Sequence, residues 1–220
     1  MADGAADAQV PGVSDPRPLR LMVYDRTCWG GRPPGLTGSW MLGGWLYRAL
    51  RRLDVFFGAA SWEEALGWLS TVKPGRRIGE VQYWGHGNWG LVRCGQERLD
   101  VRALQPAHPL YEGLARVRDR LVPDGQALWW FRTCETFGTK AGHDFARAFT
   151  RFMNARAAGH TYVIGPWQSG LHLLEPGEEP HWPVEEGLPP GVEQPLRALW
   201  SSPRCPRTIS FLHGRIPARR

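Results

Sequence analysis

Short apolar runs alternate with amphipathic segments along most of this chain. The runs at 19–24, 54–58, 78–84 and 127–131 are rich in leucine, β-branched and aromatic residues and end at glycine or polar residues. This pattern is typical of buried strands. A fifth run, Thr161 to Gly165, is predicted to be the fifth strand of the same set.

Apolar residues recur at helical spacing between these runs. Ser39 is predicted to cap a first helix, after a loop rich in glycine and proline that ends at Gly38. The sequence 61–64 has the S-x-x-E form of a capping box and opens a second helix, which runs to about Val72. The residues expected on apolar helix faces are Leu42, Trp45, Leu46, Ala49, Leu50 and Leu53, then Tyr111, Leu114, Val117 and Leu121, then Phe145, Ala148, Phe149 and Phe152.

The alternation of strand and helix predicts an α/β fold with a doubly wound, mainly parallel sheet flanked by helices. We expect residues 1–18 to form a disordered leader and residues 19–220 to form a single domain, since 220 residues fit one domain better than two. Residues from about 166 to 220 hold 10 of the 19 prolines. They are predicted to be an irregular extension in which residues 176–206 wrap over the site or serve as a lid, with a last strand near 208–212.

Two of the predicted strands lead directly to reactive side chains. The run 78–84 is followed by Gly85-His86-Gly87, and the run 127–131 by Arg132-Thr133-Cys134. Because the carboxyl ends of parallel strands meet at one edge of a sheet, we expect the imidazole of His86 and the thiol of Cys134 to lie side by side. A histidine beside a cysteine stabilises the thiolate and takes its proton, so this pair predicts a cysteine nucleophile with a histidine base.

The order and context of these elements resemble clan CD cysteine peptidases, the caspase-like group that includes metacaspases and bacterial CHAT-type proteases. The resemblance covers roughly Leu19 to Gly165 and rests on the strand-His-Gly element, the strand-Cys element and the helix after the cysteine. It implies a caspase-like sheet and cleavage of peptide bonds through an acyl-enzyme, with no metal or organic cofactor. It also implies that His86 is the general base, Cys134 the nucleophile, and the backbone amides of Gly87 and Cys134 the oxyanion hole.

Candidate substrate-binding residues follow from the same resemblance. The positions that help to shape the specificity pocket of the family match Arg132 and the pair Asp25-Arg26. The two arginines would favour an acidic substrate residue and Asp25 a basic one, so both specificities stay open. Trp89 and Trp167, expected in loops beyond strand ends, are further candidates to line the substrate groove. The sequence Arg-Thr-Cys-Glu-Thr replaces the Gln-Ala-Cys-Arg-Gly of caspases, so membership of the caspase subgroup itself is not supported.

Three other interpretations compete with a catalytic pair at His86 and Cys134. The chain would be a catalytically inactive caspase-like module that binds a protein partner. It would be a papain-like hydrolase using Cys28 and His160, which lie 132 residues apart, although the glycines and prolines after Cys28 do not favour the helix that such a nucleophile opens. A zinc site could draw on Cys134, His86, His143 or His172, but no HExxH or paired CxxC supports it.

Composition and charge narrow the class of partner. The formal net charge is +6, but the arginines are scattered and no nucleic-acid-binding module is recognisable, so we expect no nucleic-acid partner. No stretch approaches the roughly 20 apolar residues of a membrane span, and we expect no membrane partner. The four cysteines show no CxxC spacing and the N-terminus does not resemble a signal peptide, which favours free thiols in the cytoplasm. The expected partner is a protein or peptide substrate, with room for a regulatory protein.

Overall fold

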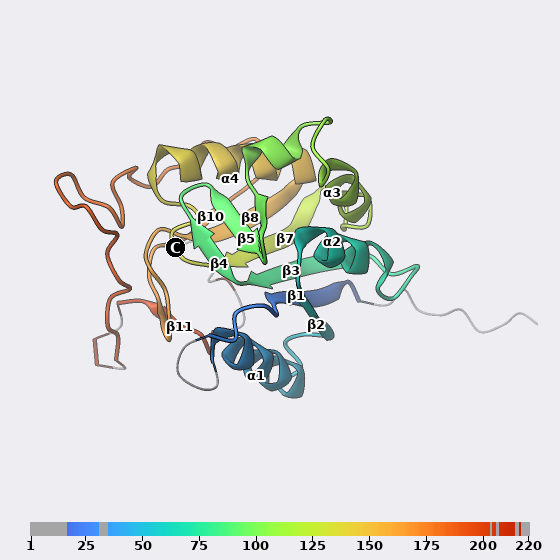
Figure 1. The fold of residues 1–220 in the computed structure, drawn as a ribbon, viewed down its shortest axis with the longest axis horizontal. Helices are drawn as coiled ribbons and strands as arrows, with labels where there is room; N and C mark the ends of the chain where they lie inside the picture. Colours follow the sequence, from blue (N-terminus) through green and yellow to red (C-terminus); the bar gives the residue numbers. More distant parts are fainter. Residues whose placement is uncertain (1–16, 31–34, 203, 206, 214–215, 217–220) are drawn as a thin grey trace, which may run out of the picture.

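A central sheet of six strands organises the fold (Figure 1). The structure is a computed structural model that describes residues 17–30, 35–202, 204, 205, 207–213 and 216. The strands of the sheet, in chain order, are β1 (Leu19–Asp25), β2 (Val55–Ala59), β3 (Ile78–Trp84), β7 (Gly125–Arg132), β8 (Ala155–His160) and β10 (Leu171–Leu174). They lie in the order β10-β8-β7-β3-β1-β2, and all pair in parallel except β10, which is antiparallel to β8.

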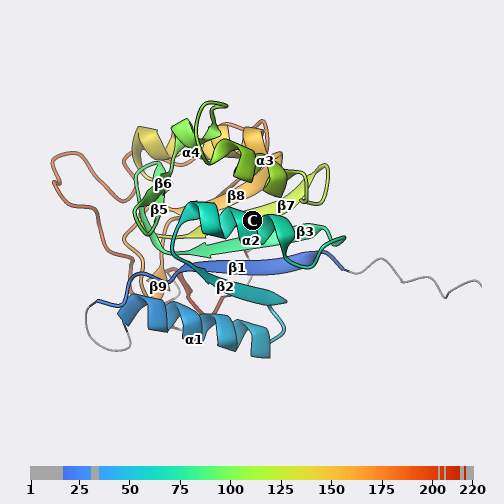
Figure 2. The same cartoon turned by 45° about the vertical axis from the view of Figure 1, so that its right-hand side comes forward.

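Helices cover both faces of this sheet, so the predicted α/β fold with a mainly parallel sheet is confirmed. Figures 1 and 2 show three helices, α2 (Trp62–Thr71), α3 (Tyr111–Arg118) and α4 (Thr139–Met153), on one face and α1 (Gly35–Ala49) on the other. The predicted leader at 1–18 falls almost wholly outside the described residues, which begin at residue 17.

Smaller elements extend from the carboxyl edge of the sheet. A three-stranded sheet of β4 (His86–Asn88), β5 (Leu91–Cys94) and β6 (Glu97–Leu99) follows β3 directly and leads into the 3-10 helix η1 (Val101–Leu104). A further pair joins β9 (Trp167–Gln168) to β11 (Ile209–Ser210), where a last strand is predicted. His86 itself belongs to the small sheet.

The strands divide their side chains between two cores. In β1, Leu21 and Val23 point into the large core beneath α2, α3 and α4, while Met22 points toward α1. Trp129 and Trp130 of β7 are both buried, on opposite faces, as their adjacent positions on a strand predict. Burial on both faces explains why these strands are apolar along their whole length.

Helix α2 forms as its capping box predicts. The Ser61 hydroxyl accepts the backbone N–H of Glu64 at 3.0 Å, and the Glu64 carboxylate accepts the backbone N–H of Ala60 at 2.7 Å. The first bond satisfies a backbone donor that the first turn of a helix leaves without a partner, and the second fixes the residue that precedes the N-cap.

Helix α1 departs from its prediction in both start and orientation. It begins at Gly35, and Ser39 lies inside it, with its hydroxyl donating to the carbonyl of Gly35 at 2.9 Å. The expected apolar face is turned to solvent: Leu42 is 58% and Trp45 56% exposed. The buried face is instead mostly glycine, together with Thr37 and Tyr47. At Gly43 and Gly44 the aromatic rings of Trp84 and Phe56 leave no room for a β-carbon.

The fifth strand also lies elsewhere than predicted. Strand β8 (Ala155–His160) consists mostly of alanine and glycine, with Arg156 and His160 as its larger residues, and the run 161–165 forms the loop that follows it. The reason is packing, since a β-carbon on Gly159 would lie 2.6 Å from the ring of Phe137. A strand in this position must have small side chains, whereas the β-branched run that attracts a strand prediction lies past the end of the sheet.

Much of the Pro-rich extension packs on the domain. Trp182 is only 4% exposed, stacks on Phe137 with ring centroids 5.5 Å apart and donates its indole N–H to the Phe137 carbonyl at 3.0 Å. Val163 donates to the carbonyl of Leu196 at 3.0 Å and accepts from the backbone N–H of Ala198 at 2.9 Å. The extension therefore reaches the loop after β8, which borders the candidate site.

Candidate functional site

His86 stands at the carboxyl end of β3. It follows the last residue of that strand, Trp84, by two positions and begins β4. Its side chain is exposed, and its ring meets the ring of Trp40 from α1 edge to face, with centroids 5.9 Å apart. The imidazole therefore lies at the open edge of the sheet, where solvent and a substrate can reach it.

Cys134 stands at the equivalent position of the neighbouring strand. It follows Arg132, the last residue of β7, by two positions, and its side chain is partly buried. Its thiol donates to the carbonyl of Ile164, with sulfur and oxygen 3.6 Å apart. Burial raises the pKa of the Cys134 thiol, the Ile164 contact lowers it, and the nearby charge of Glu135 raises it further. In this arrangement the thiol is protonated at neutral pH.

The sheet register aligns the two residues. Strands β3 and β7 pair in parallel with Trp84 opposite Arg132, so His86 and Cys134 each lie two residues past a matched pair. Gly87 is in direct contact with the chain around the thiol: a β-carbon there would lie 2.3 Å from the Thr136 hydroxyl oxygen and 2.6 Å from the Cys134 carbonyl oxygen. The two strand ends therefore touch, and only glycine fits between them.

The turn after Cys134 is backbone-strained and held by hydrogen bonds. Glu135 adopts a left-handed conformation with φ of 57°, and its backbone N–H donates to the carbonyl of Tyr162 at 3.1 Å. The hydroxyls of Thr133 and Thr136 lie 2.6 Å apart and share a hydrogen bond. Burial raises the pKa of the Glu135 carboxyl. Strain of this kind at a non-glycine residue is found preferentially at functional sites.

Arg132 is buried beneath this edge of the sheet. Its guanidinium lies between the rings of Trp84 and Trp130, at 4.4 and 4.3 Å from their centroids. It donates to the Gln168 side-chain oxygen at 2.8 Å and to the Tyr47 hydroxyl at 2.6 Å. Backbone carbonyls of the C-terminal segment accept its remaining hydrogens. The expected substrate-binding arginine is thus present next to Cys134, but the chain itself covers it.

Asp25 and Arg26 are engaged inside the protein. The carboxylate of Asp25, 1% exposed, accepts from the backbone and hydroxyl of Thr27 at 2.8 and 2.7 Å and from the backbone of Gly95 at 2.9 Å. Arg26 pairs with Glu64 at 3.1 Å on the surface. Asp25 therefore stabilises the turn after β1, which leaves Arg132 as the predicted specificity residue closest in the sheet to Cys134.

The two groove tryptophans flank the site on different sides. Trp89 is partly exposed and touches the N-cap of α4: a β-carbon on Gly138 would lie 3.3 Å from its ring. Trp167 is also partly exposed and lies in β9, opposite Ser210 of β11. Both remain accessible in part at the carboxyl edge of the sheet.

The papain-like pair is not brought together. Cys28 follows β1 and His160 ends β8, and β3 and β7 lie between those two strands. Three strand spacings amount to about 14 Å. His160 is fully buried, and burial lowers its pKa to about 3, while burial raises the pKa of Cys28 to about 11. Neither group is in a state suited to act as a base or a nucleophile with the other.

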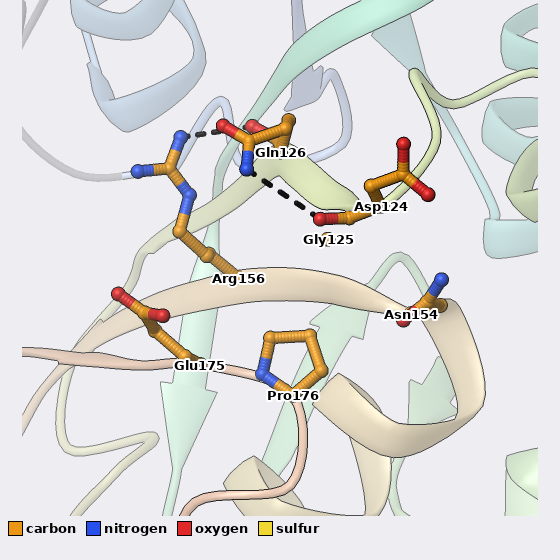
Figure 3. Close-up of a pocket in the computed structure, with 7 residues that line it drawn as sticks. All are labelled: Asp124, Gly125, Gln126, Asn154, Arg156, Glu175 and Pro176. Carbon is orange, nitrogen blue, oxygen red and sulfur yellow. Dashed lines mark hydrogen bonds between the residues drawn. The ribbon is translucent and has the colours of Figure 1, made fainter.

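A metal centre and a second pocket are the other kinds of site that bear on function. Within the described residues, no group of three or more His, Cys, Asp and Glu side chains could hold a metal ion. A polar pocket of about 380 Å³ lies where β7 and β8 begin (Figure 3). In it Arg156 donates to the carbonyl of Gln126 at 2.8 Å. Because ligand sites of open α/β sheets lie at the carboxyl ends of strands, this pocket at the opposite edge is not the candidate site.

Sequence reasoning missed the residues that hold Arg132. Tyr47 comes from α1 and Gln168 from β9, 85 and 36 residues away in the chain. Neither carries a local signal, because a tyrosine in an amphipathic helix and a glutamine after a loop are both ordinary. Only the packing of α1 and β9 against one end of the sheet brings them to the guanidinium.

Comparisons with other proteins leave the geometry as the sole guide to function. Among the described residues, no helix is both long and apolar enough to cross a membrane. No model of a protein family matches the chain, and no curated protein matches it.

Proposed function

We propose that this protein is a caspase-like cysteine endopeptidase with Cys134 as nucleophile and His86 as general base. The observation that carries the proposal is the register of β3 and β7, which sets an imidazole and a thiol two residues past the same matched pair. The contact of Gly87 with the Cys134 backbone supports it, because it leaves no room for other side chains between the two strand ends. A nucleophile and a base from neighbouring strand ends are what covalent catalysis requires.

The proposed reaction proceeds in two steps. His86 takes the proton of the Cys134 thiol, the sulfur attacks the carbonyl carbon of a peptide bond, and the imidazolium returns the proton to the departing amine. Water, deprotonated by His86, then attacks the thioester and releases the carboxylic acid and the free thiol. The backbone amides of Gly87 and Cys134 are the proposed donors to the oxyanion. The substrate is a protein or peptide, and no cofactor takes part.

The proposal includes a rearrangement before catalysis. In the structure the thiol hydrogen points to the carbonyl of Ile164, and burial raises the thiol pKa. The thiol must leave this carbonyl to donate to His86. Hydrogen bonds of catalytic pairs often form fully only when substrate is bound, so the resting contact is compatible with the proposed role.

The second candidate function is a non-catalytic module that binds a protein partner. The same protonated thiol favours it, since a buried thiol bonded to a carbonyl is unreactive. The two functions differ in whether Cys134 forms a covalent bond with a substrate-like electrophile.

An active-site probe separates the two. The full chain is treated with a peptidyl acyloxymethyl ketone library and with iodoacetamide, and the modified cysteine is mapped by mass spectrometry. We expect the peptidyl probe to capture Cys134 in preference to Cys28 and the exposed Cys205, with the capture lost in His86→Ala. Cys28→Ser is the matched control and should retain it. Equal, slow labelling of all accessible cysteines, unchanged by His86→Ala, would reject the peptidase proposal and favour the binding module.

A further inference from the structure

The C-terminal segment Ile209–His213 contacts Tyr47 of α1 and Arg132 at the end of β7, and Figure 1 shows its strand β11 near α1. Its first two residues form β11, which pairs antiparallel with β9, Ser210 lying opposite Trp167. The pairing continues one residue further, where the backbone N–H of Phe211 donates to the carbonyl of Pro166 at 3.0 Å. We call Ile209–His213 the C-terminal strap. The strap adds a strand to the edge of β9, which is how many proteins bind extended peptides.

Three successive carbonyls of the strap face basic and phenolic donors. Arg132 donates from one terminal nitrogen to the Phe211 carbonyl at 3.0 Å and from the other to the His213 carbonyl at 3.2 Å. Tyr47 donates to the same two carbonyls, and Arg52 donates to the carbonyl of Leu212. The strap is thus bound through its main chain at a cationic site.

Arg132 lacks an anionic partner among the described residues. It is 3% exposed, and no carboxylate there lies within salt-bridge distance of it. The negative charge of Glu80 favours the charged guanidinium through space, and the Glu80 carboxylate accepts from the Gln82 side-chain amide at 2.7 Å. The positive charge of Arg52 and burial both disfavour the charged guanidinium. Buried charges are normally paired, so a guanidinium bound only to neutral acceptors is an exception that calls for a ligand.

The placement of the two strap carbonyls identifies the ligand chemistry. One oxygen lies on each terminal nitrogen of the guanidinium, which is how the two oxygens of a carboxylate bind arginine. The rings of Trp84 and Trp130 pack against the guanidinium, with its carbon 4.4 and 4.3 Å from their centroids. A carboxylate would replace two neutral acceptors with two charged ones and supply the missing counter-charge.

We propose that Arg132 and the edge of β9 form a binding site for an extended peptide carrying an acidic side chain, and that the C-terminal strap is its intramolecular occupant. The peptide adds to β9 as β11 does, and its carboxylate takes the places of the Phe211 and His213 carbonyls on Arg132. Binding requires the strap to leave.

Displacement of the strap has a consequence for the thiol, and this part rests on the proposed peptidase function. The loop that contacts the strap at Pro166 also supplies the Ile164 carbonyl that accepts the Cys134 thiol hydrogen. A peptide that replaces the strap therefore acts on the same loop that holds the thiol away from catalysis. The site would select acidic substrates and link their binding to release of Cys134.

An engineered disulfide between the C-terminal strap and β9, called the lock, tests the binding site because it keeps the strap in place until it is reduced. Because Phe211 bonds to Pro166, the next pair, Ser210 and Trp167, is the closely spaced non-hydrogen-bonded kind, suited to a disulfide. The variant carries W167C, S210C and Cys134→Ala, so that binding is measured without hydrolysis. The probes are fluorescein-labelled Ala-Ala-Ala-Asp-Ala amide and its Asn counterpart, followed by fluorescence polarisation. The 167–210 disulfide is verified by mass spectrometry.

In the reduced variant we expect the Asp peptide to bind at least tenfold more tightly than the Asn peptide. In the oxidised variant this preference should disappear. The single variants W167C and S210C, each with Cys134→Ala, are the controls: whatever Asp preference each shows under reducing conditions should be unchanged under oxidising conditions, because neither can form the 167–210 disulfide. Equal affinity for the two peptides in the reduced state, or an Asp preference that survives the lock, would overturn the proposal.

The two proposals fail separately. Selective, lock-sensitive binding of the Asp peptide by a chain that hydrolyses no peptide would uphold this site and reject the peptidase. Peptide cleavage without Asp preference would uphold the peptidase and reject the acidic-peptide site. Arg132→Lys adds a variant that keeps the charge but loses the paired donors, and its Asp preference should fall at least tenfold. Since Arg132 is buried, circular dichroism checks that the Arg132→Lys variant still folds. The lock experiment does not depend on this variant.

Discussion

Gly87 decides whether the ends of β3 and β7 can meet. A substituent at its α-carbon would collide with the Thr136 hydroxyl and the Cys134 carbonyl at 2.3 and 2.6 Å, both far inside contact distance. Its role is therefore the close approach of two backbones, in addition to the oxyanion contact proposed for its N–H. At the residue scale, the site depends on this one missing side chain.

Gly87→Ala is expected to destabilise the protein by about 1–3 kcal/mol, the usual cost of forcing an extra carbon into a packed position. Chemical denaturation followed by tryptophan fluorescence measures the change. The control is Gly67→Ala on α2, where a β-carbon meets nothing within 4 Å. Because alanine favours helix, the control should be unchanged or more stable by up to about 1 kcal/mol. Equal effects of the two substitutions would contradict the close contact.

His160 makes the protein sensitive to acid. Its Nδ1 lies 3.0 Å from the Ser169 carbonyl and therefore carries the proton, while its buried Nε2 has no partner among the described residues. Burial lowers the pKa of His160 to about 3 from an ordinary value of 6.5. Below pH 6.5 the unfolded chain takes up a proton that the folded chain refuses, so stability is lost as the pH falls from 6.5 toward 3.

Between pH 7.5 and pH 5, this histidine is expected to cost about 2 kcal/mol of stability. The measurement is urea unfolding at both pH values for the natural protein and for His160→Gln, whose amide can still donate to the Ser169 carbonyl. Other titrating groups contribute to both proteins and cancel in the difference. If the two proteins lose stability in parallel, His160 is not the buried neutral group described here.

The orientation of helix α1 is set by the room that the aromatic side chains of the sheet leave, and not by the hydrophobicity of its own residues. Its apolar residues recur at helical spacing, yet four of the six buried residues of the helix are glycines, the others being Thr37 and Tyr47. A β-carbon on Gly43 would lie 2.9 Å from the Trp84 ring, and one on Gly44 would lie 2.8 Å from the Phe56 ring. The large aromatic residues of the sheet supply the apolar surface, and the helix supplies the room for them.

Gly43→Ala is therefore expected to lower stability by about 1–3 kcal/mol, although alanine is the better helix former. Leu42→Ala, one residue earlier on the exposed face, should change it by no more than about 0.5 kcal/mol. Thermal unfolding by circular dichroism compares the two. A larger loss at Leu42 than at Gly43 would mean that the helix faces the other way.

The Pro-rich extension acts on the molecule as a whole. It covers Phe137 through Trp182, bonds to the loop after β8 and ends with the C-terminal strap across Arg132. Figure 2 shows this region beside the sheet edge where β9 lies. The extension is therefore joined to the candidate site at three places, and its role in stability can be tested apart from any activity.

Trp182→Ala is expected to cost about 3–5 kcal/mol, the range for removing a large buried aromatic side chain. Trp200→Ala, in the same extension but 66% exposed, should stay within about 0.5 kcal/mol of the natural protein. Guanidinium chloride unfolding measures both. A small effect of Trp182→Ala would show that the extension is a separate, weakly attached segment.

Local pattern was sufficient for the elements whose own residues dictate them. Strands β1, β3 and β7 and helix α2 follow from apolar runs and a capping box, since burial on both faces and orphan backbone donors impose those residues directly. The position of His86 and Cys134 past two strand ends follows for the same reason. The adjacency of these strands needed only the rule that consecutive parallel strands tend to be neighbours.

Tertiary structure decided what depends on residues distant in the chain. The glycine face of α1 and the small residues of β8 are set by aromatic rings from other elements, so a local hydrophobic pattern misplaces both. The cover over Arg132 is assembled from α1, β9 and the C-terminal strap, which no spacing along the chain reveals. By itself, the sequence determined which strands carry the reactive side chains, because a buried strand must be apolar along its own length. Only packing decided what surrounds those side chains, because their neighbours come from elements that are distant in the chain.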